Sequence, residues 1–291
     1  MKDSLSGVKI LMQNQQTFFK VMPFLKQAIR LIFLVLAMMI VVACTVSRPV
    51  GNGTRLPYET IEGGRHYFPD DIGMEWTYTG SIIEHLQRVS TYTNITKVTG
   101  TTQKGDERVT IFHESNPANR GESESYFKRN KEGITYFGGE PTTDFERQFI
   151  PYRVIPFPIV FQKPYVQIEK TGLLYDIDMD NDGINEKADI RAEVIAMGFE
   201  TITTPAGIFR NALKLQGRMI IGLTLSVNHK KAEMLDTTTH WFAPGVGMVQ
   251  GIEKIEFSSV AGSTPSGTLI TEILQRFNTN GTPSPFDSPG Y

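Results

Sequence analysis

The sequence predicts an all-β fold: an antiparallel meander that forms a strongly curved sheet or open half-barrel in a single domain. Residues 88–96 are rich in Val, Thr, Tyr and Ile, which suit a pleated surface. Apolar and polar residues alternate over residues 213–218 and again over 223–228, which is the period of a strand with one solvent-facing side. No long stretch shows the apolar spacing of a helix.

Polar or glycine-bearing breaks divide the strand-like stretches at short intervals, as hairpin turns would. They fall at residues 105, 130–133, 138–139, 181–183 and 262–267.

The N-terminal region predicts export. Residues 31–43 (LIFLVLAMMIVVA) are uninterrupted apolar residues, preceded by Lys20, Lys26 and Arg30. As a helix they would span roughly 20 Å, less than the roughly 30 Å of a bilayer core, so a signal peptide fits better than a membrane span. Met1 and Met22 both remain open as the start site.

The end of this apolar run resembles the lipobox of bacterial lipoprotein precursors. It reads Val41-Val42-Ala43-Cys44 and contains the only cysteine of the chain. The resemblance implies that residues 1–43 are removed and that Cys44 carries acyl chains such as palmitate, which anchor the protein in a membrane. The residue after the cysteine is Thr45, and in Gram-negative lipoproteins a residue other than Asp there implies the outer membrane, facing the periplasm. The alternative is an uncleaved anchor with an incidental cysteine.

Composition divides the rest of the chain into three parts. Residues 44–62 hold the lipidated cysteine and a flexible tether rich in Gly, Pro and Thr. Residues 63–277 form the all-β domain, and residues 278–291 read as a disordered tail.

Three segments resemble an uncharacterised family of bacterial exported β-sheet lipoproteins. They are residues 67–78 (YFPDDIGMEWTY), 203–209 (TTPAGIF) and 240–249 (HWFAPGVGMV), similar to YFP…GxxWxY, TPAGxF and WxAPGVGxV motifs. The resemblance implies a half-barrel-like antiparallel sheet and no catalytic residues. The large aromatic residues of these segments are expected in the core, with ligand stacking left open: Trp76, Tyr78, Phe209 and Trp241.

An acidic loop resembles known calcium-binding loops. Counting from Asp178, carboxylates stand at positions 1, 3, 5 and 9, and Gly183 at position 6 allows a sharp bend. The loop departs from the EF-hand because position 12 is Asp rather than Glu. Six carboxylates within 14 residues also repel one another unless a cation neutralises them. The candidate Ca²⁺ ligands are Asp178, Asp180, Asp182, the carbonyl of Ile184, Glu186 and Asp189.

An exposed acidic hairpin without metal is the alternative, since Asn181-Asp182-Gly183 makes a turn on its own. If calcium binds, we expect a structural role and weak affinity, with a Kd of about 10⁻⁴ to 10⁻³ M.

A second candidate site is the aromatic, proline-punctuated segment 154–161 (VIPFPIVF). Its prolines exclude it from a central strand, so it is predicted to be an edge strand or crossing loop. It either covers the apolar face of the sheet or forms the rim of a ligand cleft. The cleft candidates are Ile155, Phe157 and Phe161.

Composition and motifs together favour a binding protein over an enzyme. The formal net charge is −2, so no basic surface for nucleic acid is expected. His113-Glu114 begins like a zinc-protease motif, but Pro117 breaks it, and no nucleophile elbow or phosphate-binding loop occurs.

We therefore expect a membrane-anchored, non-catalytic binding or accessory module of the cell envelope, with an envelope protein as partner. The alternative is a carrier or sensor of an apolar ligand held by the concave face of the sheet. A hydrolase is the least favoured function.

Overall fold

The computed structural model describes residues 60–61, 67–84, 88–180, 182–258 and 266–278. Twelve antiparallel strands form one continuous sheet, which confirms the predicted all-β class. In sheet order they are β7 (Tyr152–Pro156), β6 (Gly133–Glu140), β5 (Ser123–Asn130), β4 (Glu107–Glu114), β3 (Arg88–Lys104), β2 (Glu75–Glu84), β14 (Ser266–Asn278), β13 (Gly247–Ser258), β12 (Lys231–Ala243), β11 (Gly207–Thr224), β10 (Lys187–Thr204) and β9 (Tyr165–Leu174).

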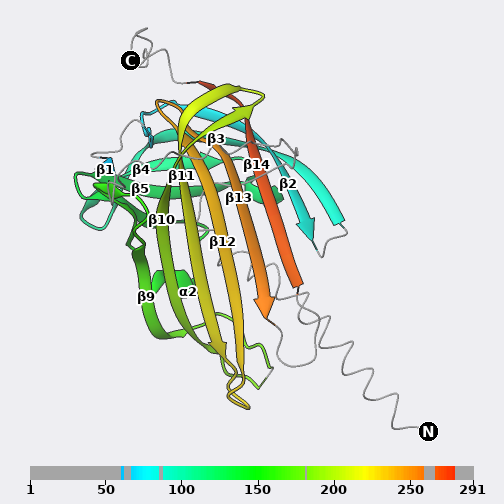
Figure 1. Ribbon diagram of the computed structural model, residues 1–291. Helices are drawn as coiled ribbons and strands as arrows, with labels where there is room; N and C mark the ends of the chain where they lie inside the picture. The colour runs from blue at the N-terminus through cyan, green and yellow to red at the C-terminus, as the bar shows by residue number, and fades with distance from the viewer. Residues whose placement is uncertain (1–59, 62–66, 85–87, 181, 259–265, 279–291) are drawn as a thin grey trace, which may run out of the picture.

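The sheet is a meander with one long-range junction. Every pair of neighbouring strands is consecutive in sequence except β2 and β14, which join the N-terminal and C-terminal parts of the described fold. Figure 1 shows the long strands β10 to β14 side by side, with β3, β4 and β5 crossing behind them. Register shifts within several ladders, such as those in β10–β11 and β12–β13, help the strands to bend.

The two edge strands of the sheet lie next to each other, so the sheet rolls further than a half-barrel. β7 and β9 pack together without forming a ladder. The side-chain Nε2 of Gln167 on β9 donates to the Val154 carbonyl on β7 at 2.6 Å. The edge position of β7 confirms the prediction from the prolines of residues 154–161.

A short helix, α2 (Asp144–Arg147), lies inside the roll (Figure 1). Phe145 and Phe149 are buried and pack among apolar residues of β6, β9, β10, β11 and β12. The Thr143 hydroxyl caps the helix by accepting from the Glu146 amide, as a threonine at an N-cap does.

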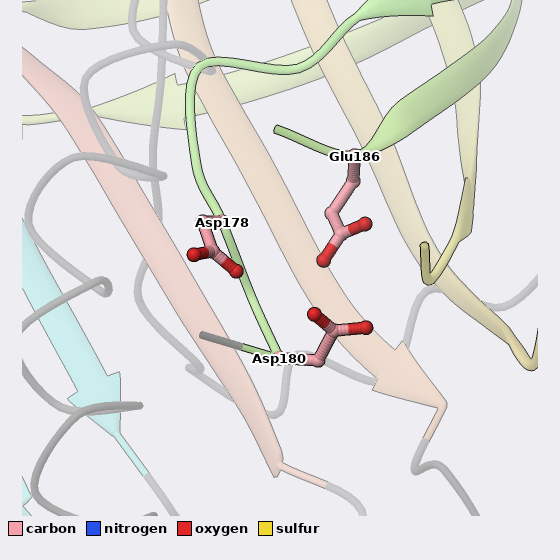
Figure 2. Close-up of side chains that lie close together, drawn as sticks. All are labelled: Asp178, Asp180 and Glu186. Carbon is pink, nitrogen blue, oxygen red and sulfur yellow. The ribbon is translucent and has the colours of Figure 1, made fainter. Parts of the chain in front are cut away.

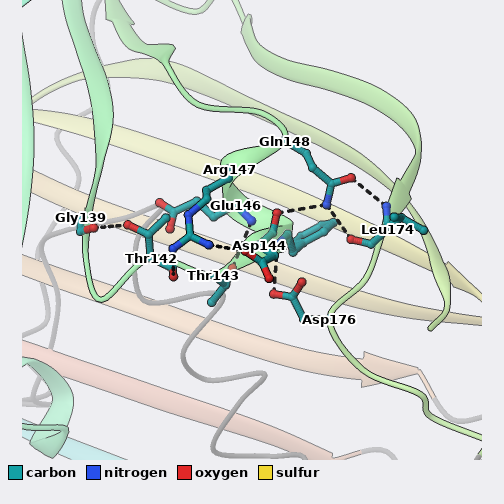
Figure 3. Close-up of polar contacts among 10 residues, drawn as sticks. Gly139, Thr142, Thr143, Asp144, Glu146, Arg147, Gln148, Leu174 and Asp176 are labelled. Atoms are coloured by element: carbon teal, nitrogen blue, oxygen red, sulfur yellow. Dashed lines mark hydrogen bonds and ion pairs between the residues drawn. The ribbon is translucent and has the colours of Figure 1, made fainter. Parts of the chain in front are cut away.

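Polar contacts tie α2 to the chain that leads into the acidic loop (Figure 3). The Gln148 side chain donates to the Leu174 carbonyl and accepts from the Leu174 amide, at 2.7 and 2.9 Å. Asp176 accepts from the Phe145 amide at 3.0 Å.

Two short elements complete the fold. A 3₁₀ turn, η1 (Pro117–Asn119), packs against β2 and β3. β1 (Thr60–Ile61) pairs with β8 (Ile159–Val160), so these two residues of the predicted tether join a strand pair. Among the described residues, no helix has the length and apolar character needed to cross a membrane. The predicted signal, Cys44 and residues 279–291 lie outside the described residues.

Candidate functional site

Two of the three sequence motifs contact each other at one end of the roll. The indole Nε1 of Trp76 donates to the Val246 carbonyl, and the Tyr78 hydroxyl donates to the Met248 carbonyl at 3.0 Å. Gly247, between these acceptors, has a φ of 93°, and Trp76 packs against it closely. These hydrogen bonds join residues 170 positions apart in the chain.

The third motif packs into the same apolar cluster. Thr204 accepts from the Ala206 amide at 3.1 Å, which stabilises the turn between β10 and β11. Phe209 follows the turn and packs with Trp76 and Trp241 in one cluster. The three segments that resemble the family motifs therefore pack together as one structural unit.

Next to this unit, the rolled sheet forms a cavity of about 180 Å³ that is partly open to solvent. For comparison, an apolar cavity of roughly 150 Å³ in another protein admits benzene. The lining is largely aromatic and aliphatic. It consists of Tyr67, Phe68, Pro69, Asp70, Trp76, Tyr78, Thr96, Phe112, Phe127, Arg129, Ile134, Val154, Ile155, Gln167, Val194, Leu215, Gly217, Thr238, His240, Phe242, Gly247, Met248 and Glu272.

The segment 67–70 forms one wall of the cavity, and we call it the strap. Arg129 on β5 forms an ion pair with Asp70 and donates to the Phe68 carbonyl at 2.9 Å. At its other end, the Tyr67 hydroxyl donates to the Asn211 carbonyl at 3.3 Å. The strap is therefore held to strands on two sides of the roll.

Polar side chains of β12 and β14 also line the cavity. Thr238 pairs in register with Gly217, and His240 lies two residues further along the same face of β12. Gly251 on β13 pairs with His240 on one side and with Glu272 on the other. Because glycine has no side chain, nothing from β13 separates the side chains of His240 and Glu272. Thr238 and Glu272 are each 3% exposed.

Further carboxyl groups lie in the interior beside this polar part of the lining. Burial, and then the neighbouring Glu253, raises the pKa of Asp236 well above its usual value. Burial raises the pKa of Glu253 to about 7, although Arg120 nearby opposes the shift. Burial also raises the pKa of Glu114 to about 7, against a hydrogen bond from Asn94. Near neutral pH this interior therefore holds both carboxylic acids and carboxylates.

The structure separates the three predicted cleft residues. Ile155 lines the cavity. Phe157 and Phe161 are buried in the core behind it, where Phe157 contacts Phe68 of the strap and Phe161 contacts Phe199. The segment 154–161 thus contributes a wall through Val154 and Ile155, and structural support through its two phenylalanines.

The acidic loop brings together three of the six predicted calcium ligands. Carboxylate oxygens of Asp178, Asp180 and Glu186 lie within 4.8 Å of one another, and Figure 2 shows the three groups pointing toward a common centre. Glu186 is fully buried and accepts from the amides of Met179 at 3.0 Å and Ser226 at 2.9 Å. A buried carboxylate held by backbone amides in this way is a fixed point of negative charge.

Two of the remaining predicted ligands, Asp182 and Asp189, are not part of this cluster. Asp182 accepts from the Ser226 hydroxyl at 2.8 Å, beside Asp180. The Ile184 side chain is exposed. Asp189 points elsewhere, because its carboxylate accepts from the Gly172 amide on β9 at 2.9 Å.

Sequence reasoning missed the polar part of the cavity lining. A signal was present in β12, where Met234, Asp236, Thr238, His240 and Phe242 alternate with residues of the other face. Polar residues between apolar ones on a core-facing side are unusual, because each must find a partner. Glu272 and Gln167 have no comparable local signal.

Comparisons with known proteins identify no family for this chain. No family model matches it, and no curated protein matches it. Among solved structures, a proposed exported protein with a YmcC-like fold from Bacteroides fragilis is 14% identical, with a TM-score of 0.33, covering 72% of this chain and 98% of its own. A proposed lipoprotein from Parabacteroides distasonis is 14% identical, with a TM-score of 0.32, covering 73% and 98%. Likenesses this distant say nothing about what this chain does.

Proposed function

We propose that this protein is a lipid-anchored, non-catalytic module of the bacterial cell envelope that binds a small, largely apolar molecule inside its rolled sheet. The cavity of about 180 Å³ is the observation that carries the proposal. Its volume fits one ring or a short alkyl chain rather than a complete lipid. The lipobox at Cys44 supports the anchor, and Thr45 supports the outer membrane facing the periplasm.

The construction of the cavity favours binding over simple packing. Aromatic rings surround it on several sides, as in small-molecule sites of other proteins. A strap held by Arg129 forms one wall, so this part of the lining is fixed in place before any ligand binds.

Tryptophan fluorescence provides a direct test. The chain has two tryptophans, of which only Trp76 lines the cavity. The Trp241→Phe variant therefore leaves Trp76 as a reporter, and 4-bromotoluene bound in the cavity would quench it through the bromine. We expect saturable quenching in the full-length protein in liposomes. Quenching that only rises linearly with probe concentration would show partitioning into lipid and would contradict the proposal.

A second proposed role is structural, and the cluster of Asp178, Asp180 and Glu186 favours it. We propose that Ca²⁺ binds these carboxylates and holds the loop between β9 and β10 against Ser226 and Val227. This would make the protein a calcium-stabilised accessory module whose partner is another envelope protein. Loss of ligand binding with retention of calcium binding would leave this role standing.

A further inference from the structure

The hydrogen-bonding groups that line the cavity differ in whether they already have a partner within the protein. Two lining residues each have a single donor that is already used within the protein. Trp76 donates to the Val246 carbonyl, and Tyr78 donates to the Met248 carbonyl. Neither donor is available to an acceptor on a ligand, and Arg129 is directed to Phe68 and Asp70 of the strap.

Two lining oxygens, by contrast, have no hydrogen-bond partner among the described residues. They are Thr238 Oγ1 and Gln167 Oε1, both of which are buried. The orientation of the Gln167 amide is set by its Nε2, which donates to the Val154 carbonyl, so its oxygen is left as an acceptor. A buried polar atom without a partner is unfavourable, and a ligand group that hydrogen-bonds to it would remove that cost.

The carboxyl groups in and beside the cavity also favour a ligand that donates hydrogen bonds. Glu272 lines the cavity and is 3% exposed. Glu253 and Asp236 lie on the same face of the neighbouring strands, with Arg120 the basic group close to them. An anionic group placed beside Thr238 would be repelled by those of these carboxyl groups that are ionised, whereas a neutral donor or a cation would not.

We propose that the cavity binds an amphipathic molecule with a ring-sized apolar body and a hydrogen-bond-donating head, a hydroxyl or an amine, that contacts Thr238 and Gln167. Carboxylate amphiphiles are disfavoured, because they cannot donate to Gln167 and would lie near the carboxyl group of Glu272. This inference rests on the proposed function, because it names the ligand class of the same cavity.

The test compares four probes that share one bromophenyl ring: 4-bromotoluene, 4-bromobenzyl alcohol, 4-bromobenzylamine and 4-bromobenzoate. Each is titrated at pH 8 into the full-length Trp241→Phe protein in liposomes, with saturable quenching of Trp76 as the readout. We expect the alcohol or the amine to bind at least about tenfold more tightly than the benzoate, because the benzoate cannot donate to Gln167 Oε1 and meets like charge in the interior. The alcohol and amine arms distinguish the two kinds of head group.

The Thr238→Val variant removes the hydroxyl and keeps the shape of the side chain. It should weaken binding of the better head group by about fivefold and leave 4-bromotoluene unaffected, and Thr238→Ser should restore binding. Unchanged 4-bromotoluene binding also shows that the variant retains its fold.

The outcomes separate the two proposals. Equal affinity for the benzoate, or an affinity for the alcohol and amine that Thr238→Val leaves unchanged, would overturn the head-group assignment while the cavity function survives. No saturable quenching by any of the four probes would overturn both.

Discussion

The guanidinium group of Arg129 on β5 binds Asp70 of the strap. It thereby joins two parts of the cavity wall that are far apart in the chain. It forms an ion pair with Asp70 and also donates to the carbonyl of Phe68, at 2.9 Å. Both side chains of the pair are mostly buried, with exposed fractions of 16% for Arg129 and 21% for Asp70. Arg129 therefore holds the part of the strap at Phe68 and Asp70 to β5, while Tyr67 is bonded to Asn211 at the other end.

Removing this side chain should loosen the strap. We expect Arg129→Gln to lower the free energy of unfolding by about 1–3 kcal/mol, the range for hydrogen bonds to charged groups, and to accelerate ligand exchange. Urea unfolding and stopped-flow quenching of Trp76 measure the two effects. Arg153→Gln is a matched control, because Arg153 pairs with Glu132 at a more exposed position. An equal effect of both substitutions would argue against a special role of the strap.

Filling the cavity should abolish binding without unfolding the protein. Gly217 lines the cavity from the middle of β11, and valine is well suited to a strand. We expect Gly217→Val to eliminate saturable quenching by 4-bromotoluene while the melting temperature stays the same or rises. The control is Gly222→Val on the same strand, where an added Cβ meets nothing within 4 Å. Persistent binding in Gly217→Val would place the probe elsewhere.

Calcium should raise the melting temperature through the acidic loop. At about ten times a Kd of about 1 mM, calcium would add about 1.4 kcal/mol to the free energy of unfolding. For a domain of this size that corresponds to about 3–5 °C, measurable by calorimetry with and without a chelator. We expect Asp180→Asn to remove the increase. Asp189→Asn should keep it, because Asp189 bonds to Gly172 outside the cluster. An increase in both variants or in neither would contradict this site.

Stability should fall as pH rises from weakly acidic to weakly alkaline conditions, and Glu146 should be a main cause. Burial raises the pKa of Glu146 from 4.5 to about 8, outweighing the hydrogen bond from Tyr136. Between these two values the folded chain holds a proton that the unfolded chain has released, so folding is favoured at low pH and weakened as pH rises.

The Glu146→Gln variant tests this sign. It keeps an acceptor for Tyr136 but cannot ionise, so its free energy of unfolding should fall less steeply between pH 5 and pH 8. A single such group contributes up to about 1.4 kcal/mol per pH unit in this window. Parallel profiles for the variant and the unaltered protein would show that Glu146 is not responsible.

Local sequence patterns were sufficient to predict the architecture and to name the three acidic residues that lie together in the loop. Asp178, Asp180 and Glu186 lie within nine residues of one another, so a single tight loop brings them together. Asp189 lies away from these three residues because β10 has already begun, and the burial of Ala188 and Ile190 turns it to the other face of the strand.

The cavity could not be predicted, because its lining comes from strands that are distant in the chain. Ile155 was named from its proline-rich surroundings and does line the cavity. Phe157 and Phe161 share those surroundings but pack into the core, since only the way the sheet rolls decides which side of the segment faces inward.

The sequence by itself determined that the chain forms an antiparallel meander with a proline-limited edge, since alternation, turn residues and prolines act over a few neighbouring positions. Only the tertiary structure decided how far the sheet rolls and therefore what it encloses. Closure brings Gln167 of β9 to Val154 of β7 and places Thr238, Glu272 and the strap around one cavity. Such contacts depend on the summed twist and bulges of twelve strands, which no single stretch of sequence specifies.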